Sequence, residues 1–189
     1  MILSIRASDF YQTPDSLHTS DLGRCLGKEG LPGTLVIISG PMGIGKTEWA
    51  RGVAQGLGVP DGIMSPTFLY VQLYPPSPDR ACPGFLHADW DRVEGGSEDL
   101  EDSLLEGMEN RVTLVEWGEK LPESVMRSFP VKVHVSLSWV TGGRGVGMEW
   151  CSVEELGDSL LNWRQSFDSC ARPLGACSGQ SRAVIHPVL

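Results

Sequence analysis

The sequence predicts an α/β domain in three layers, with a mainly parallel central sheet and an antiparallel hairpin late in the chain. Two observations lead to this prediction. Short apolar runs of the kind that form strands buried on both faces alternate with segments of helical character. Residues 131–139 then alternate apolar and polar side chains before a glycine-rich turn, a pattern typical of a half-exposed strand in a hairpin.

The first half of the chain predicts one buried strand between two helices. Thr13 stands before a proline, as a capping hydroxyl does, and predicts a helix over 13–26. Residues 34–39 read TLVIIS, a continuous apolar run that predicts a strand buried on both faces. A second helix is expected over 47–57, because a glycine and a proline follow it. The proline-rich segment 74–84 predicts a loop.

Two further buried strands end in acids. The apolar run 85–88 is followed by Asp89, and the run 112–115 is followed by Glu116. Between them, acidic residues in a first turn favour a helix over 97–108. These segments extend the strand and helix alternation that predicts the α/β class.

The C-terminal third predicts the hairpin and one more helix. Residues 148–151 return as the antiparallel partner of 131–139, and capping-box spacing predicts a helix over 152–163. No periodicity survives after that helix. We therefore expect residues 1–165 to form one domain and residues 166–189 to form an irregular C-terminal tail.

The charge of the chain excludes several classes of partner. Its 189 residues include 24 acids and 15 bases, which gives a net charge of −9. Such a chain is poorly suited to bind DNA, RNA or an anionic membrane by charge alone. An anionic ligand would need a local positive site that outweighs the overall field.

The cysteines and the apolar segments of the sequence indicate in which cellular compartment the protein is expected. Five scattered cysteines match neither a zinc site nor a dense disulfide framework, so we expect free thiols in a reducing environment. The first ten residues do not resemble a signal peptide, and no apolar run approaches the roughly 20 residues of a membrane span. These features predict a cytoplasmic protein.

The most informative motif is a glycine-rich turn between the strand 34–39 and the helix 47–57. It reads GPMGIGKT and matches the phosphate-loop pattern G-x-x-x-x-G-K-[ST]. Glycines let backbone N–H groups curl around phosphate, the lysine reaches the β- and γ-phosphates, and the hydroxyl ligates Mg²⁺. The motif predicts a P-loop nucleoside triphosphatase fold with a cofactor site at Gly40, Pro41, Met42, Gly43, Ile44, Gly45, Lys46 and Thr47.

Such a site needs a carboxylate near Thr47, and two acids qualify. Asp89 and Glu116 each follow a buried strand, although an acid in this position can also cap the next loop. Asp91 lies in a polar stretch and is expected to be a solvated turn residue. Thr67, in the segment Ser-Pro-Thr-Phe after the second helix, is a candidate sensor of the γ-phosphate, and the alternative is that Ser-Pro only begins a loop.

Two basic residues have open interpretations. His87 precedes Asp89 by two residues and either orients that acid or makes a structural hydrogen bond. Arg144 lies in a glycine turn, where it either swings onto a phosphate or faces solvent.

Several motifs in order resemble one family. They are Thr19 with Leu-Gly, then GPMGIGKT, Arg-Gly, Leu-Gly, SPTF, HADWDR and LVEW, between Thr19 and Arg144. This series is similar to the TsaE (YjeE) family, the ATPase of bacterial tRNA threonylcarbamoyladenosine biosynthesis. The phosphate loop alone is unspecific, whereas the combination with SPTF, His-x-Asp and Leu-Val-Glu-Trp is much more specific.

The resemblance implies a weak ATPase that uses ATP and Mg²⁺. It would act with TsaD, which transfers the threonylcarbamoyl group to adenosine-37 of tRNA, and with TsaB. The chain would reach tRNA only indirectly, through that complex, and would bind neither DNA nor a membrane. By motif, the family's roles fall on Lys46 and Thr47 (phosphate and Mg²⁺), Thr67 (switch), Asp89 (metal or water), Glu116 (Mg²⁺ or catalysis), Trp117 and Arg144 (beside the nucleotide) and Thr19 (near the adenine).

The chain departs from the family pattern in ways that leave other functions open. Pro41, Met42 and Ile44 replace variable loop positions, and Asp91 stands where the family has a tyrosine. A P-loop small-molecule kinase is the main alternative, although no arginine cluster suggests the lid that such kinases use. A nucleotide-gated interaction module with negligible turnover is the third possibility.

Overall fold

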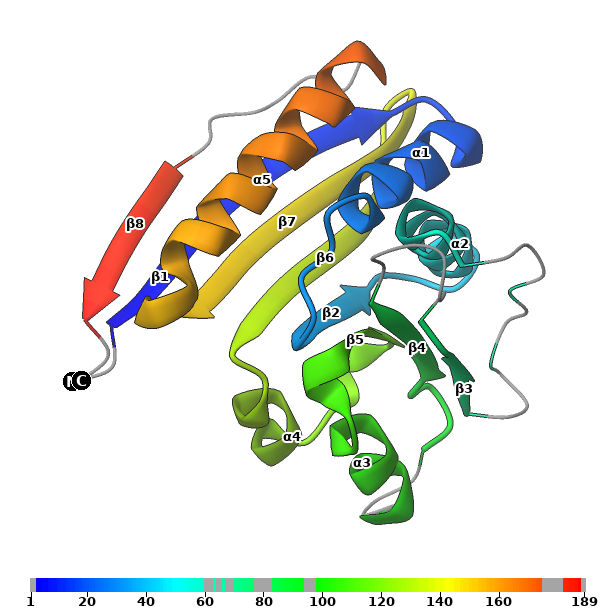
Figure 1. The fold of residues 1–189 in the computed structure, drawn as a ribbon. Helices are drawn as coiled ribbons and strands as arrows, with labels where there is room; N and C mark the ends of the chain where they lie inside the picture. Colours follow the sequence, from blue (N-terminus) through cyan, green and yellow to red (C-terminus); the bar gives the residue numbers. More distant parts are fainter. Residues whose placement is uncertain are drawn as a thin grey trace.

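The computed structural model describes residues 3–59, 63, 66, 70–76, 83–93, 98–174 and 182–187. Across these residues an eight-stranded sheet has the order β3-β4-β5-β2-β6-β7-β1-β8 (Figure 1). The strands are β1 (Leu3–Thr13), β2 (Thr34–Ser39), β3 (Val71–Tyr74), β4 (Gly84–Asp89), β5 (Arg111–Glu116), β6 (Val131–Val140), β7 (Gly143–Val153) and β8 (Arg182–Pro187). The helices are α1 (Ser16–Gly27), α2 (Lys46–Leu57), α3 (Glu98–Leu105), α4 (Glu123–Ser128) and α5 (Gly157–Ala171).

The α/β class and the late hairpin are confirmed, but the sheet is mixed. The central strands β4, β5, β2 and β6 are parallel, and β6 and β7 form the expected antiparallel hairpin. The prediction of a mainly parallel sheet is wrong because β3, β7, β1 and β8 all pair antiparallel with their neighbours.

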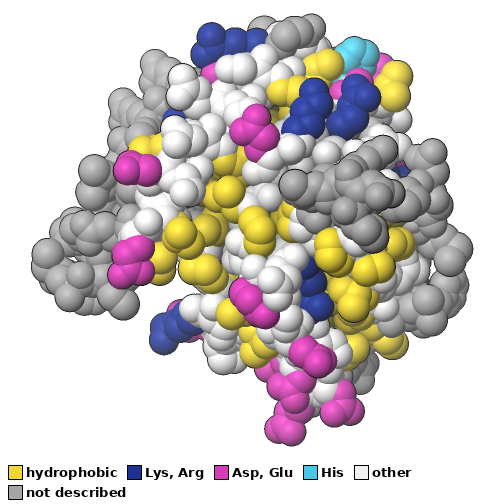
Figure 2. All heavy atoms as spheres, viewed as in Figure 1, with side chains coloured by type: hydrophobic (Ala, Val, Ile, Leu, Met, Phe, Trp, Pro, Cys, Tyr) yellow, Lys and Arg dark blue, Asp and Glu magenta, His cyan; other side chains and the backbone are white. Residues whose placement is uncertain are grey.

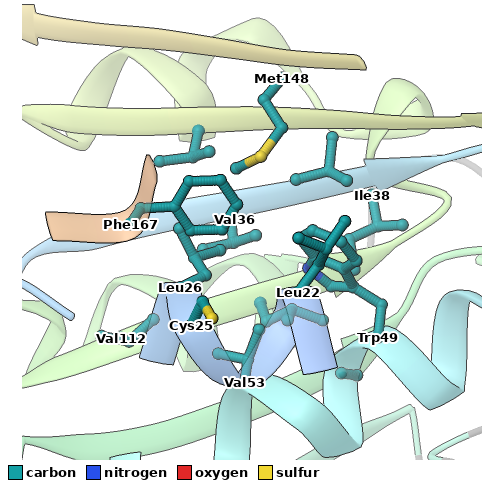
Figure 3. Packing of buried hydrophobic residues seen from close by; sticks show 14 of the residues in the cluster. Leu22, Cys25, Leu26, Val36, Ile38, Trp49, Val53, Val112, Met148 and Phe167 are labelled. Atoms are coloured by element: carbon teal, nitrogen blue, oxygen red, sulfur yellow. The ribbon is translucent and has the colours of Figure 1, made fainter. Parts of the chain in front are cut away.

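The two faces of the sheet build two hydrophobic clusters. Along β2, Val36 and Ile38 join α1, α2 and α5 in one cluster, and Leu35 and Ile37 join α3 and α4 in the other. This double burial explains why the strand is a continuous apolar run. Figure 3 shows the first cluster, in which Phe167 from α5 and side chains of α1 and α2 lie against the sheet.

Helices α1 and α2 meet backbone to backbone. A Cβ atom added to Gly52 would lie 2.0 Å from the carbonyl oxygen of Ser20, and one added to Gly23 would lie 2.4 Å from that of Trp49. Glycine is therefore required where the helices cross. This contact seats the helix that follows the phosphate loop.

An ion pair between Arg164 of α5 and the buried Asp9 of β1 fixes helix α5 to the sheet. Arg164 donates to both carboxylate oxygens of Asp9 on β1, at 2.7 Å each. The indole N–H of Trp150 on β7 donates to the same carboxylate at 2.9 Å, and its ring meets Trp163 edge to face. The buried acid is thus paired and hydrogen-bonded, as burial of a charge requires.

A disulfide joins Cys25 of α1 to Cys170 of α5, with 5.6 Å between their Cα atoms. The expectation of free thiols is therefore wrong for this pair. The two residues are 145 positions apart, and nothing in their sequence spacing indicates that the fold brings them together.

The ends of three predicted elements are corrected. Thr13 is the last residue of β1, and the cap of α1 is Asp15, whose carboxylate accepts the His18 N–H at 2.9 Å. Residues 152–153 end β7, so the predicted capping box is absent and α5 begins at Gly157. The helix expected over 97–108 is shorter, because α3 ends at Leu105.

The prediction of an irregular C-terminal tail over residues 166–189 is wrong for two segments. Helix α5 continues to Ala171, and residues 182–187 form strand β8 against β1. Strands β1 and β3 and helix α4 had no counterpart in the sequence prediction. Within the described ranges, no helix has the length and apolar character needed to cross a membrane.

Candidate functional site

The phosphate-loop motif connects β2 to α2 through a tight turn. Gly45 precedes the helix with a φ of 111°, in the left-handed region that favours glycine. Gly40 has a φ of 137°, and a Cβ atom there would lie 2.5 Å from the carbonyl oxygen of Leu137. The loop therefore passes close to β6, and α2 directs its first N–H groups toward the loop.

Lys46 lies folded into this loop with 6% of its surface exposed. Its Nζ donates to the carbonyl oxygens of Gly40 at 2.8 Å and Pro41 at 3.0 Å. The same ammonium lies 3.7 Å from the centre of the Trp117 ring. Burial lowers the pKa of Lys46, and the carboxylate of Glu116 opposes that shift. The site thus holds a buried cation. An anionic ligand would attract this cation and offset the free-energy cost of its desolvation.

Parallel pairing brings the two predicted acids together. Asp89 at the end of β4 is the register partner of Glu116 at the end of β5. Glu116 is 3% exposed and accepts two hydrogen bonds, from Thr47 Oγ1 at 3.1 Å and from His87 Nε2 at 2.9 Å. Because the fully buried His87 makes its hydrogen bond with Glu116, it orients that carboxylate rather than the acid two residues further along β4.

Asp89 also serves the alternative role expected of an acid after a strand. Its Oδ1 accepts the backbone N–H of Asp91 at 2.9 Å and so fixes the turn that leaves β4. Its side chain nevertheless reaches the same cavity as Glu116.

Trp117 adopts a left-handed backbone conformation, with a φ of 56°. For an aromatic residue this conformation is strained, and surrounding contacts must hold it. The following residues Gly118–Lys120 form a 3-10 turn, and a Cβ atom on Gly118 would lie 2.6 Å from a methyl group of Ile37. The packing of this turn on β2 holds the conformation that places the Trp117 ring over Lys46.

These side chains surround a cavity of about 310 Å³. Of the predicted site residues, it is lined by Met42, Gly43, Gly45, Lys46, Thr47, Asp89, Glu116 and Trp117. Sequence reasoning did not select three other lining residues, Glu48, Asp91 and Arg92. Asp91 lies in a turn, as expected, and its carboxylate also accepts from Lys120 at 2.8 Å. The signal in the sequence that points to Asp91 is its position, where the TsaE family has a tyrosine.

Other predicted residues lie outside this cavity. Thr19 is buried and makes its hydrogen bonds with Thr13, at 2.7 Å, and with the carbonyl of Asp15, at 2.8 Å. Arg144 donates to the carbonyl of Ile44 at 2.8 Å and lies over the Trp139 ring, so it braces the back of the loop. Thr67 lies outside the described residues.

A magnesium ion is compatible with the donors at Thr47 and Glu116. The described residues contain no group of three or more His, Cys, Asp or Glu side chains placed to hold a metal. Mg²⁺ commonly uses only one or two protein oxygens together with waters and substrate phosphates. The hydroxyl and carboxylate oxygens 3.1 Å apart supply such a pair.

Comparison with known proteins finds relatives that carry the name TsaE. TsaE of Streptomyces coelicolor, named tRNA threonylcarbamoyladenosine biosynthesis protein, is 41% identical over 100 residues, 52% of this chain and 66% of that protein. TsaE of Mycobacterium tuberculosis is 37% identical over 111 residues, 56% of this chain and again 66% of the relative. The chain thus spans just under two thirds of these two proteins. TsaE of Bacillus subtilis is 32% identical over 116 residues, 61% of this chain and 70% of that protein.

Structure and family comparisons agree with these relatives. The crystal structure of Bacillus subtilis YdiB matches with a TM-score of 0.54 over 92% of this chain and 97% of that chain, at 17% identity, which shows a shared fold. The family model described as "Threonylcarbamoyl adenosine biosynthesis protein TsaE" matches residues 13–142. Because that match covers more than half of the sequence and includes the phosphate loop, Glu116 and Trp117, the chain belongs to the TsaE family.

Proposed function

We propose that this protein binds and hydrolyses Mg-ATP as an accessory protein of tRNA threonylcarbamoyladenosine modification at position 37, acting with TsaD and TsaB. Its parallel strands and phosphate loop would then form a three-layer P-loop ATPase domain. The observation that supports the proposal best is the meeting of Lys46, Thr47 and Glu116 at one cavity. Membership of the TsaE family supports the proposed pathway, and the residues of the cavity support the proposed chemistry.

The residues of the cavity suggest how they would act on ATP. Lys46 would exchange the carbonyls of Gly40 and Pro41 for phosphate oxygens, while loop N–H groups bind the remaining oxygens. Thr47 and Glu116 would hold Mg²⁺, which neutralises phosphate charge and positions the γ-phosphate. Glu116, oriented by His87, would also place a water for attack.

The surface charge favours an indirect relation to tRNA. The chain carries a net charge of −9, and acidic side chains gather over α3 at the lower end of the view (Figure 2). This field repels a phosphate backbone. We therefore propose that tRNA is reached only through TsaD and TsaB.

Calorimetry tests the nucleotide site. In the Lys46→Ala variant, ATP binding should be lost, because no other described lysine lies in the loop. Lys28→Ala is the matched control, since Lys28 is exposed after α1 and should leave ATP affinity unchanged. Equal affinities for wild type and Lys46→Ala would overturn the assignment.

The fate of γ-labelled ATP separates this proposal from a small-molecule kinase. Label that appears only as free phosphate supports hydrolysis, whereas label in an organic acceptor supports the kinase. Adding purified TsaD and TsaB then tests the partnership. ATP-dependent binding to that complex is expected, and absence of binding with and without ATP would contradict it.

A further inference from the structure

A second cavity, of about 380 Å³, lies on the face of the sheet that carries α3 and α4. We call it the β6 groove, and it is lined by Ile37, Ser39, Gly118, Glu119, Met126, His134, Val135, Ser136 and Glu149.

The β6 groove combines an apolar floor with acidic walls. Ile37 is buried on this face and Met126 is half-buried beside it, whereas the side chain of Val135 belongs to the cluster on the opposite face. Glu119 and Glu149 are exposed and reach the groove from different elements, the 3-10 turn before α4 and strand β7. The register explains the second acid, because His134 pairs with Ile37 on one side and with Glu149 on the other.

This combination fits a long basic side chain. The methylenes of arginine or lysine pack on apolar surface while the charged head stays at the rim, where carboxylates accept its hydrogen bonds. An anionic ligand would be repelled by both acids. The whole chain, at −9, attracts a basic surface and steers its approach. We propose that the β6 groove is a docking site for an arginine or lysine side chain of a partner protein.

The groove and the nucleotide cavity share one wall. Trp117 lines the nucleotide cavity, and the next two residues, Gly118 and Glu119, line the β6 groove. A Cβ atom on Gly118 would lie 2.6 Å from a methyl group of Ile37, so this turn packs directly against β2. A basic side chain in the groove therefore contacts the same turn that holds the Trp117 ring over Lys46. This coupling rests on the proposed function, whereas docking itself does not.

An NMR titration of the full chain tests docking without nucleotide. The probe is N-acetyl-arginine methylamide, and N-acetyl-citrulline methylamide is the matched ligand, with the same shape and no charge. The arginine probe should give saturable shifts at Ser39, Gly118 and Ser136. The citrulline probe should bind at least about fivefold more weakly, as expected for the loss of one partly exposed charge contact.

Two variants test whether the arginine probe binds in the β6 groove. Glu149→Gln should weaken arginine binding by about fivefold, whereas Glu123→Gln, on the exposed surface of α4, should leave it unchanged. The proposal is overturned if the arginine probe gives no saturable shifts, if citrulline binds equally well, or if Glu149→Gln binds as tightly as wild type. Since no nucleotide is present, these outcomes are independent of ATP binding, which calorimetry tests separately.

Discussion

Thr47 and Glu116 lie 69 positions apart in the sequence, and the hydroxyl of the first donates to the carboxylate of the second at 3.1 Å. Thr47 lies in the first turn of α2, after the phosphate loop, and Glu116 ends β5 beside β2. The hydrogen bond joins the phosphate-binding turn to the acidic edge of the sheet. Loss of either group should therefore affect hydrolysis more than the fold.

Glu116→Gln tests the carboxylate. The amide keeps the size of the side chain and removes its charge, so ATP should still bind to within a few-fold. Phosphate release should fall by about 100-fold or more, the scale seen when one catalytic acid or base is lost. Glu123→Gln, whose acid pairs with Arg127 on the surface, should hydrolyse ATP at the wild-type rate. Wild-type hydrolysis by Glu116→Gln would exclude a catalytic or metal-binding role.

His87→Phe tests the positioning of Glu116. Phe keeps the stacking of this buried ring on Phe85 but leaves Glu116 Oε1 without its donor. The rate constant for hydrolysis should fall by about tenfold while KM for ATP stays nearly constant, because phosphate contacts are intact. His87→Gln can still donate and should recover part of the rate. Equal rates in the two variants would indicate that His87 only fills space.

The Asp9 and Arg164 pair tests what fixes α5. Arg164→Met removes the guanidinium from beside the buried Asp9 carboxylate and should lower the free energy of unfolding by about 3 kcal/mol. Adding Asp9→Asn to that variant removes the carboxylate charge, so the double variant should be more stable than Arg164→Met. Urea unfolding of the four proteins measures the coupling. Strictly additive changes would contradict a direct interaction.

Asp15 gives a pH dependence of known sign. The backbone N–H of His18, followed by its ring, lowers the pKa of this exposed carboxyl below its usual value. A depressed folded-state pKa means that the cap stabilises the protein above the ordinary aspartate pKa and that this stability is lost as pH falls through the depressed value. Asp15→Ala should therefore lower Tm at neutral pH, and the difference from wild type should vanish in strong acid. A constant difference in Tm would contradict the assignment.

The parts of the structure that could be predicted are those whose cause is local. Residues 34–39 are apolar on both faces, so their pattern identifies a buried strand without knowledge of the neighbours. The phosphate loop is contiguous, and its chemistry is contained in eight residues. Glu116 could be selected because the end of a buried strand is also visible in the sequence.

The parts that could not be predicted depend on distant partners. Residues 7–13 of strand β1 alternate buried and exposed side chains, but one buried position is Asp9, whose partner Arg164 is 155 residues away. The disulfide likewise joins two cysteines that no local motif relates. Thr19 carries a family motif, yet its hydroxyl is committed to Thr13 and Asp15 inside the fold, which only the structure reveals.

The glycine contact between α1 and α2 also has a consequence for the order of folding. Only residues 28–45 separate the two helices, so closing this contact costs little chain entropy compared with the pairing of β1 with β7 or β8. Because the two backbones are in direct contact at these glycines, the helices can dock there without first packing side chains between them. During synthesis, α2 can therefore dock on α1 before β7, β8 and Cys170, which lie later in the chain, have been synthesised.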